Sequence, residues 1–231
     1  AGEAQQGGSL KELVMQYWRP MLTMSGLVIA LNVVNYTLLS YMPTYLETQL
    51  GLSSSASLAT ILIGEVAMMA VIPFAGSLSD KVGRRPMWYA SVIGLFVLAL
   101  PMFWLMGQSF AWAIVGFAVL GLLYIPQLAT ITATFPAMFP SQVRFAGFAI
   151  TYNIATAIFG GTAAMVNEAA IDSTGFLLFP AIYMMAACVI GAIAIKFMPE
   201  TAGASLRGTE IPDALDTGIL ATVQQDETRT S

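Results

Sequence analysis

Six long apolar runs, each near the length of a membrane-crossing helix, occupy most of this 231-residue chain. A helix needs roughly 20 residues, at about 1.5 Å each, to cross about 30 Å of hydrocarbon. Strands of a membrane barrel would be shorter and would alternate in polarity. The sequence therefore predicts an all-α membrane protein with six transmembrane helices. The predicted spans are Leu22–Leu46, Ser57–Gly76, Met87–Met106, Ala111–Ala133, Ala146–Met165 and Gly175–Phe197.

The composition agrees with a membrane protein and excludes several other classes. Hydrophobic residues make up 57% of the chain and charged residues 10%, against about 25% charged in a soluble domain. Nine Lys and Arg are too few for a nucleic-acid-binding surface, and the absence of His, with a single Cys, removes imidazole metal sites and His-based triads. Nothing pairs a nucleophile with a base. We therefore expect no enzyme, no metal and no nucleic-acid partner.

Basic residues near the spans all fall on one side of the predicted membrane. The positive-inside rule makes that side cytoplasmic and puts both termini inside. Acidic residues mark the opposite connections, at Glu47, Glu168 and Asp172. The basic residues are Lys11, Arg19, Lys81, Arg84, Arg85, Arg144, Lys196 and Arg207.

The connection between the second and third spans, Gly76–Pro86, reads G-S-L-S-D-K-V-G-R-R-P. Gly76 and Gly83 permit a close helix approach and a tight turn. Asp80 is an acceptor placed to hold Arg84 or a helix N-terminus. The cations expected at the anionic leaflet are Lys81, Arg84 and Arg85.

This connection resembles the signature loop of the major facilitator superfamily, G-x-x-x-D-R/K-x-G-R-R/K; the alternative is an ordinary positive-inside loop. Phe135–Arg144, F-P-A-M-F-P-S-Q-V-R, resembles the F-P-x-x-x-R loop between the fourth and fifth helices of a facilitator half, which singles out Arg144. Pro199–Thr201, P-E-T, resembles the segment after the last helix in the sugar-porter branch. The resemblance implies a twelve-helix fold, of which these six helices form the C-terminal half.

Further motifs between Leu10 and Glu200 resemble the proline/betaine transporters of the metabolite:proton symporter family. They are Y-W-R-P, G-L-V-I-A-L-N-V, Y-M-P-T-Y-L, P-A-M-F-P and Y-N-I. The resemblance implies alternating-access symport of a small zwitterion such as proline or glycine betaine in a bacterial inner membrane. The proton gradient is the energy source, and no cofactor is expected. The C-terminal tail lacks the heptads of osmosensing members, which puts osmotic activation in doubt.

The resemblance also divides the chain into three parts. Residues 1–21 resemble the central cytoplasmic linker, 22–200 form the transmembrane half, and 201–231 form a polar tail. Because the chain begins at Ala1 without Met, we expect an N-terminal six-helix half upstream as its partner, and no transport by this chain alone.

Glu65 is the only ionisable side chain deep in an apolar run. Burying a carboxylate there costs roughly 2.5–3.5 kcal/mol, so such residues usually face a cavity or a partner. One interpretation is proton binding or substrate contact. The other is a protonated glutamate bonded to a neighbouring helix. The family resemblance supplies no acid at this position.

The first span carries a polar stripe, because Asn32, Asn35 and Tyr36 share one helical face. An amide and a phenol can solvate a carboxylate, while aromatic faces attract an ammonium group. Tyr152 and Asn153 form a similar patch in the fifth span. Both sets are predicted to line a substrate cavity. The alternative is hydrogen bonding between helices, worth about 0.6 kcal/mol per contact.

Two other functions stay open at this stage. The first is proton symport of a carboxylate metabolite, which members of the same family carry out. The second is a six-helix membrane scaffold that transports nothing.

Overall fold

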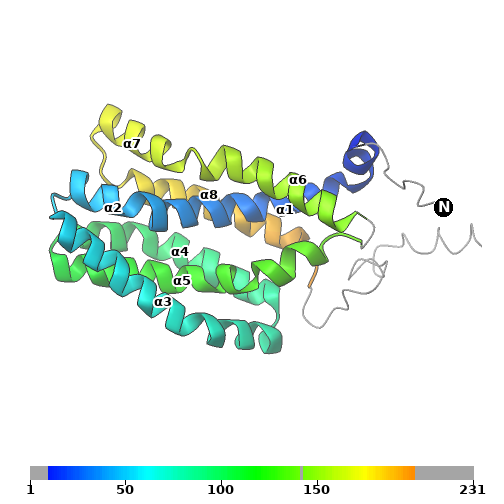
Figure 1. The fold of residues 1–231 in the computed structure, drawn as a ribbon, viewed down its shortest axis with the longest axis horizontal. Coiled ribbons are helices and arrows are strands. Elements are labelled where there is room, and N and C mark those ends of the chain that lie inside the picture. Colours follow the sequence, from blue (N-terminus) through cyan, green and yellow to red (C-terminus); the bar gives the residue numbers. More distant parts are fainter. Residues whose placement is uncertain (1–9, 141–142, 201–231) are drawn as a thin grey trace, which may run out of the picture.

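The computed structural model describes residues 10–140 and 143–200, with side chains from Val14 onward, and this part of the chain is helical (Figure 1). Short π-helical segments interrupt two of the spans. In chain order the elements are α1 (Leu10–Asn35), η1 (Tyr36–Tyr41), α2 (Met42–Thr44), η2 (Tyr45–Gln49), α3 (Ser54–Val82), α4 (Arg84–Met106), α5 (Phe110–Ala137), α6 (Arg144–Ala155), η3 (Thr156–Gly160), α7 (Ala163–Thr174) and α8 (Phe179–Phe197).

The six predicted membrane spans are confirmed among the described residues, judged by length and composition. Most spans extend beyond the predicted ends, because helical backbone hydrogen bonding continues past the apolar stretch. The third and sixth spans end where predicted. The sixth begins at Phe179 rather than Gly175, because Gly175, with its φ of 68°, caps the end of α7. The observed spans are Val14–Gln49, Ser54–Val82, Arg84–Met106, Phe110–Ala137, Arg144–Thr174 and Phe179–Phe197.

Two of the differences from the sequence prediction have a clear local cause. The helix α1 begins at Leu10 and kinks at Tyr17 (φ −114°, ψ 22°), since Pro20 removes a donor and crowds the preceding turn. The predicted loop Gly76–Pro86 is mostly helical, because α3 runs to Val82 and α4 starts at Arg84. Only Gly83 separates these helices, and its φ of 101° suits a glycine.

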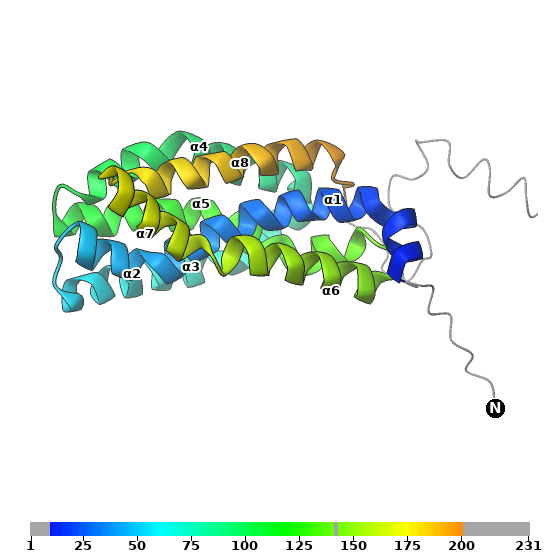
Figure 2. The ribbon, with the colours of Figure 1, turned by 90° about the horizontal axis from the view of Figure 1, so that it is seen from above.

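The helices form a bundle whose two long sides differ. The central helices are α1 and α5, because α5 packs on α3 and α4 while α1 packs on α8 and α6. Figure 2 shows α4 and α8 along one side and α3, α6 and α7 along the other. Figure 1 shows α3 and α6–α7 at opposite edges of that second side. We call this side the polar face, for reasons given below.

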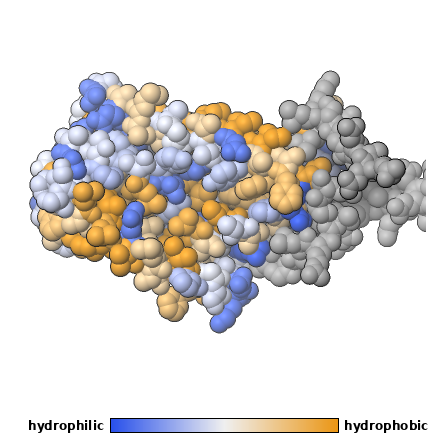
Figure 3. All heavy atoms as spheres, in the orientation of Figure 1, coloured by the Kyte–Doolittle hydropathy of each residue, from blue (hydrophilic) through white to orange (hydrophobic). Residues whose placement is uncertain are grey.

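The two ends of the bundle differ in charge. Basic residues lie where α1, α4 and α6 begin and where α3 and α8 end, and these points share one end of the bundle in Figure 1. We call this the basic end. Glu47, Glu168 and Asp172 lie at the opposite, acidic end. Figure 3 shows hydrophobic residues gathered over the middle of the molecule, as a membrane span requires. The predicted contributions of Lys11 and Arg207 fall on side chains outside the described residues.

Helices α3 and α5 approach closely because glycines face large side chains. A Cβ built on Gly64 would lie 2.2 Å from the ring of Phe117, and one on Gly121 would lie 2.6 Å from Met68 Sδ. Gly76, in the same helix as Gly64, has no described atom within 4 Å of a built Cβ. The close approach predicted at Gly76 is therefore not made inside this bundle.

We expect Gly64→Ala to destabilise the full-length protein, with Gly76→Ala as the matched control in the same helix. Alanine gains up to about 1 kcal/mol over glycine in a helix, but overpacking a filled core costs about 1–3 kcal/mol. At Gly64 the Phe117 ring must move, whereas at Gly76 the added methyl group meets open space. Thermal unfolding of the purified variants measures both. Equal melting curves for the two variants would contradict this packing.

Candidate functional site

A polar seam runs along α1 on the polar face and joins it to two neighbouring spans. Asn32 Nδ2 donates to Thr156 Oγ1 at 2.8 Å, which links α1 to η3. Asn35 Nδ2 donates to the Tyr124 hydroxyl at 2.7 Å, which links α1 to α5. The two asparagines of the predicted stripe therefore bond to two different neighbours of α1.

The members of the seam differ in exposure. Asn32 is 3% exposed, so its amide acts as a link between helices. Asn35 and Tyr36 are half-buried and present part of their surface on the polar face. The Tyr36 ring lies against Gly160, where a built Cβ would be 2.6 Å from the ring. Asn32 and Asn35 both make the interhelical hydrogen bonds of the alternative interpretation. Cavity lining stays a prediction for Asn32, Asn35 and Tyr36.

Tyr152 and Asn153, the patch predicted in the fifth span, have different surroundings in the structure. Tyr152 is half-buried and stacks on Phe148, with ring centroids 5.5 Å apart. Asn153 is exposed, and its Nδ2 donates to the Ala149 carbonyl of its own helix at 2.7 Å. The two residues are sequence neighbours, so their side chains point about 100° apart around a helix. The Tyr152 ring is partly exposed and could contact a substrate, whereas the Asn153 amide is already hydrogen-bonded within its own helix.

A second polar group lies between α4 and α5. Gln127 Nε2 donates to Ser91 Oγ at 2.8 Å, and Ser91 Oγ donates to the Leu123 carbonyl at 2.6 Å. Both side chains are fully buried. This network stabilises the packing of α4 on α5 and has no access to the polar face.

Glu65 lies on a stripe of exposed apolar residues at the α3 edge of the polar face. Leu58, Leu62 and Met69, which share its helical face, are 60%, 63% and 61% exposed. Glu65 itself is half-buried. Its side chain has no hydrogen-bond partner among residues 14–140 and 143–200, so the bonded-glutamate alternative is not observed within this bundle.

The opposite edge of the polar face is also apolar and exposed. On α6, η3 and α7 the side chains of Ile154, Ile158 and Met165 are 57%, 54% and 66% exposed. Asn35 is bonded to α5, which packs on α3, and Tyr36 lies against Gly160 of η3, so both side chains lie between the α3 edge and the α6–α7 edge.

At the basic end, Glu200 occupies the position expected of Asp80. The Glu200 carboxylate accepts the backbone N–H groups of Arg84 at 2.9 Å and Arg85 at 3.1 Å. These are unsatisfied donors at the positive end of the α4 dipole, which a carboxylate stabilises. Asp80 lies in the last turn of α3, is exposed, and makes no hydrogen bond to α4. Its role as an acceptor in another conformation stays a prediction.

Basic residues of the loops Gly76–Pro86 and Phe135–Arg144 donate hydrogen bonds to backbone carbonyls in or just after the last turn of a helix. Arg84 Nη1 donates to the Ala133 carbonyl of α5, and Arg85 Nη2 to the Lys196 carbonyl of α8, each at 3.4 Å. Arg144 Nε donates to the Phe139 carbonyl at 3.2 Å. Cations at these carbonyls are favoured by the helix dipole. Lys81 is exposed.

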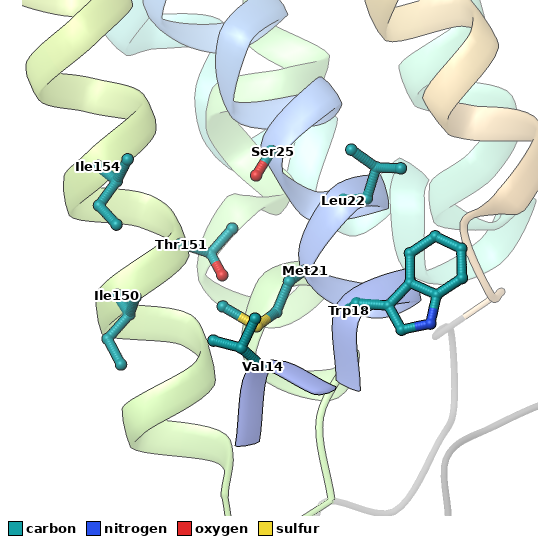
Figure 4. A pocket seen from close by; sticks show the side chains of 8 residues that line it. All are labelled: Val14, Trp18, Met21, Leu22, Ser25, Ile150, Thr151 and Ile154. Atoms are coloured by element: carbon teal, nitrogen blue, oxygen red, sulfur yellow. The ribbon is translucent and has the colours of Figure 1, made fainter. Parts of the chain in front are cut away.

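A cavity of about 290 Å³ opens between α1 and α6 at the basic end (Figure 4). Its walls are apolar except for two hydroxyl groups. Of these, the buried Thr151 Oγ1 has no hydrogen-bond partner within the described part of the chain. The lining residues are Val14, Trp18, Met21, Leu22, Ser25, Ile150, Thr151 and Ile154. The described residues contain no cluster of three metal-ligating side chains.

Comparison with known proteins gives the family. The family model described as "Sugar (and other) transporter" matches residues 1–211. The chain is 37% identical to the proline/betaine transporter of Escherichia coli K12 and 35% identical to the ectoine/proline transporter ProP of Corynebacterium glutamicum. Each match covers 87% of this chain and 40% of the relative.

A third relative agrees with these. The glycine betaine/proline/ectoine/pipecolic acid transporter OusA of Dickeya dadantii is 36% identical over 89% of this chain and 41% of its own length. The chain thus spans about two fifths of the length of these relatives. The family and the relatives are transporters rather than enzymes, as the sequence predicted. With six helices able to cross a membrane, the chain is an integral membrane protein that belongs to the Sugar (and other) transporter family of the major facilitator superfamily.

Proposed function

We propose that this chain is the C-terminal half of a secondary active transporter that carries a small zwitterion, such as proline or glycine betaine, together with a proton. The observation that carries this proposal is the polar seam between two exposed apolar edges. The substrate class is suggested by the relatives, which are proline, betaine and ectoine transporters.

The layout of the polar face supports a second bundle as its partner. Polar groups in the membrane interior are expensive against lipid and usually face a cavity or another helix. Here the half-buried Asn35 and Tyr36 lie between edges that apolar helices can cover. The remaining length of the relatives is enough for such a partner. A central cavity then forms between the halves, and rocking of one half against the other gives alternating access.

The chemistry of the seam suits a zwitterion. The half-buried Asn35 amide can solvate a carboxylate, and the rings of Tyr36 and Tyr152 can attract an ammonium group. The Lys and Arg side chains of residues 14–140 and 143–200 all lie at the basic end. Within this part of the chain no cation stands at the seam to balance the extra charge of a dicarboxylate.

The charge of the two ends supports an orientation. With six described basic residues at one end, the positive-inside rule makes the basic end cytoplasmic. The plasma membrane of a bacterium is the expected location. The tail assignment (201–231) falls outside the described residues, whereas residues 10–21 of the assigned linker (1–21) belong to α1; both assignments stay predictions.

The substrate class is tested by uptake in cells that express the full-length protein. We expect uptake of labelled glycine betaine that excess proline suppresses and that a membrane uncoupler abolishes. Succinate, a dicarboxylate, should leave uptake unchanged, because the described half supplies no cation for a second carboxylate. Suppression by succinate but not by proline would favour symport of a carboxylate metabolite. Absence of any uptake by a well-inserted protein would favour the scaffold.

Glu65 is the coupling carboxylate that this proposal favours in this half, and Glu65→Gln tests it. Gln keeps the shape and polarity but cannot exchange a proton, so accumulation against a gradient should fall at least about tenfold, which is about 1.4 kcal/mol. Solute counterflow, which needs no net proton movement, should persist.

The control for Glu65→Gln is Met69→Gln, which places the same amide one turn further along the same exposed stripe. We expect this variant to keep both activities. Unchanged accumulation in Glu65→Gln, or equal losses in the two variants, would reject a coupling role for Glu65.

The contact between Glu200 and α4 is tested by Glu200→Gln beside Asp80→Asn. Gln presents an amide N–H₂ to one of two backbone donors, so one charge-assisted bond is lost and the N-terminus of α4 loosens at a cost of about 1–3 kcal/mol. Glu200→Gln should therefore lower thermal stability as well as transport. Asp80→Asn should leave stability unchanged and reduce transport only. A stability loss for Asp80→Asn equal to that of Glu200→Gln would contradict this division of roles.

A further inference from the structure

At the acidic end, side chains from η1 and η2 donate hydrogen bonds to a carboxylate on α7. Tyr41 Oη donates to Glu168 Oε2 at 2.6 Å, and Gln49 Nε2 donates to Glu168 Oε1 at 3.3 Å. We call these three residues the carboxylate clasp. Each oxygen of the carboxylate thus accepts from a different turn of the first span. The clasp joins residues that are more than a hundred positions apart in the chain.

Two further hydrogen bonds join η1–η2 to α7 and the segment that follows it. Asn167 Nδ2 donates to Thr37 Oγ1 at 3.3 Å, between two fully buried side chains. Tyr45 Oη donates to the Leu177 carbonyl at 3.0 Å. The clasp is therefore the charged member of a row of contacts that holds the end of the α7 span on η1–η2.

Neutral donors take the place of a cation at Glu168. The Lys and Arg side chains within the described part of the chain all belong to the basic end. The other titratable groups that face this region are Tyr45, Asp172 and Glu47, none of which is cationic. Asp172 is exposed one turn further along α7, and Glu47 accepts from Ser54 at 3.1 Å. Among the described contacts that hold α7, the half-buried Glu168 carboxylate thus supplies the charge.

The backbone on both sides of this boundary contains π-helical turns. The first span carries η1 and η2, and the other carries η3 immediately before α7. Such turns weaken regular helical bonding and often mark points of bending. The Tyr36 ring, at the start of η1, lies against Gly160, at the end of η3, so the π-helical segments η1 and η3 are in contact.

We infer that the carboxylate clasp is an acid-released latch on α7. Ionised Glu168 holds α7 against η1–η2 through charge-assisted bonds, which are about twice as strong as neutral ones. A proton taken from the solution at the acidic end binds one carboxylate oxygen and replaces a charge-assisted bond with a neutral one. The end of α7 is then free to bend away at η3. Only the side from which the proton arrives rests on the proposed function.

A buried reporter beneath the clasp tests this inference in the full-length protein. Ala163, in α7 and fully buried, is replaced by Cys in a Cys188→Ala background, and an impermeant maleimide is added from outside. Glu168→Gln mimics the protonated carboxylate. At about pH 8 it should raise the labelling rate five- to tenfold, the ratio expected when a charge-assisted bond becomes neutral.

The pH dependence separates a latch from a merely structural contact. The ratio of labelling rates, Glu168→Gln over unchanged Glu168, cancels the titration of the thiol itself. It should fall toward one as the outside pH is lowered from about 8 to about 4.5, because protonated Glu168, like the Gln side chain, makes only neutral hydrogen bonds. A ratio that is one at high pH, or that stays constant with pH, overturns the inference.

Two variants keep the test independent of folding defects. Tyr41→Phe retains the ring and removes one donor, so it should also speed labelling at high pH. Asp172→Asn removes a neighbouring charge that makes no described hydrogen bond, so it should leave both the rate and its pH response unchanged. An equal effect of Asp172→Asn would overturn the latch. Labelling from the cytoplasmic side alone would refute the proposed orientation, while the rate ratios would still test the clasp.

Discussion

The hydrocarbon core of a bilayer offers no water to a polar group, so a polar group there is stabilised by a partner within the protein. This constraint accounts for the all-helical architecture, because a helix satisfies its own backbone. It also accounts for the links between helices. Asn32 bonds to Thr156 on another span, and Gln127 bonds to Ser91 on its neighbour. Polar side chains in this bundle therefore help to fix which helices adjoin.

The same constraint limits where the helices can be irregular. The π-helical turns η1 and η3 lie where α1 packs against the α6–α7 span, so their weakened backbone bonding is shielded by protein. Glycine has a related role, since Gly64 and Gly160 let a ring come into contact with a helix backbone. The bundle is thus tight along α3–α5 and locally deformable along α1–α7. Under the proposed alternating access, that difference would let the polar face change shape while the α3–α5 packing stays fixed.

The number of spans, the family and the polar stripe could be predicted from the sequence because each depends on residues close together in the chain. Apolar length predicts a span, and helical spacing puts Asn32 and Tyr36 on one face. Partners could not be predicted in this way. Glu200 caps α4 across more than a hundred residues, and Glu168 reaches Tyr41 across a similar separation. The P-E-T motif was the available signal for Glu200. Glu168 offered none beyond its charge.

Glu200 and Glu168 occupy opposite ends of the bundle and join two spans in the same way. Each carboxylate accepts from neutral donors on a distant span, either the backbone N–H groups of α4 or the side chains of Tyr41 and Gln49. Near the headgroups a carboxylate can lose or regain water and protons at modest cost, whereas inside the hydrocarbon it cannot. In the proposed transport cycle, contacts that form and break would therefore be best placed at these ends. The buried contacts of Asn32 and Gln127 can stay intact and preserve the order of the helices throughout.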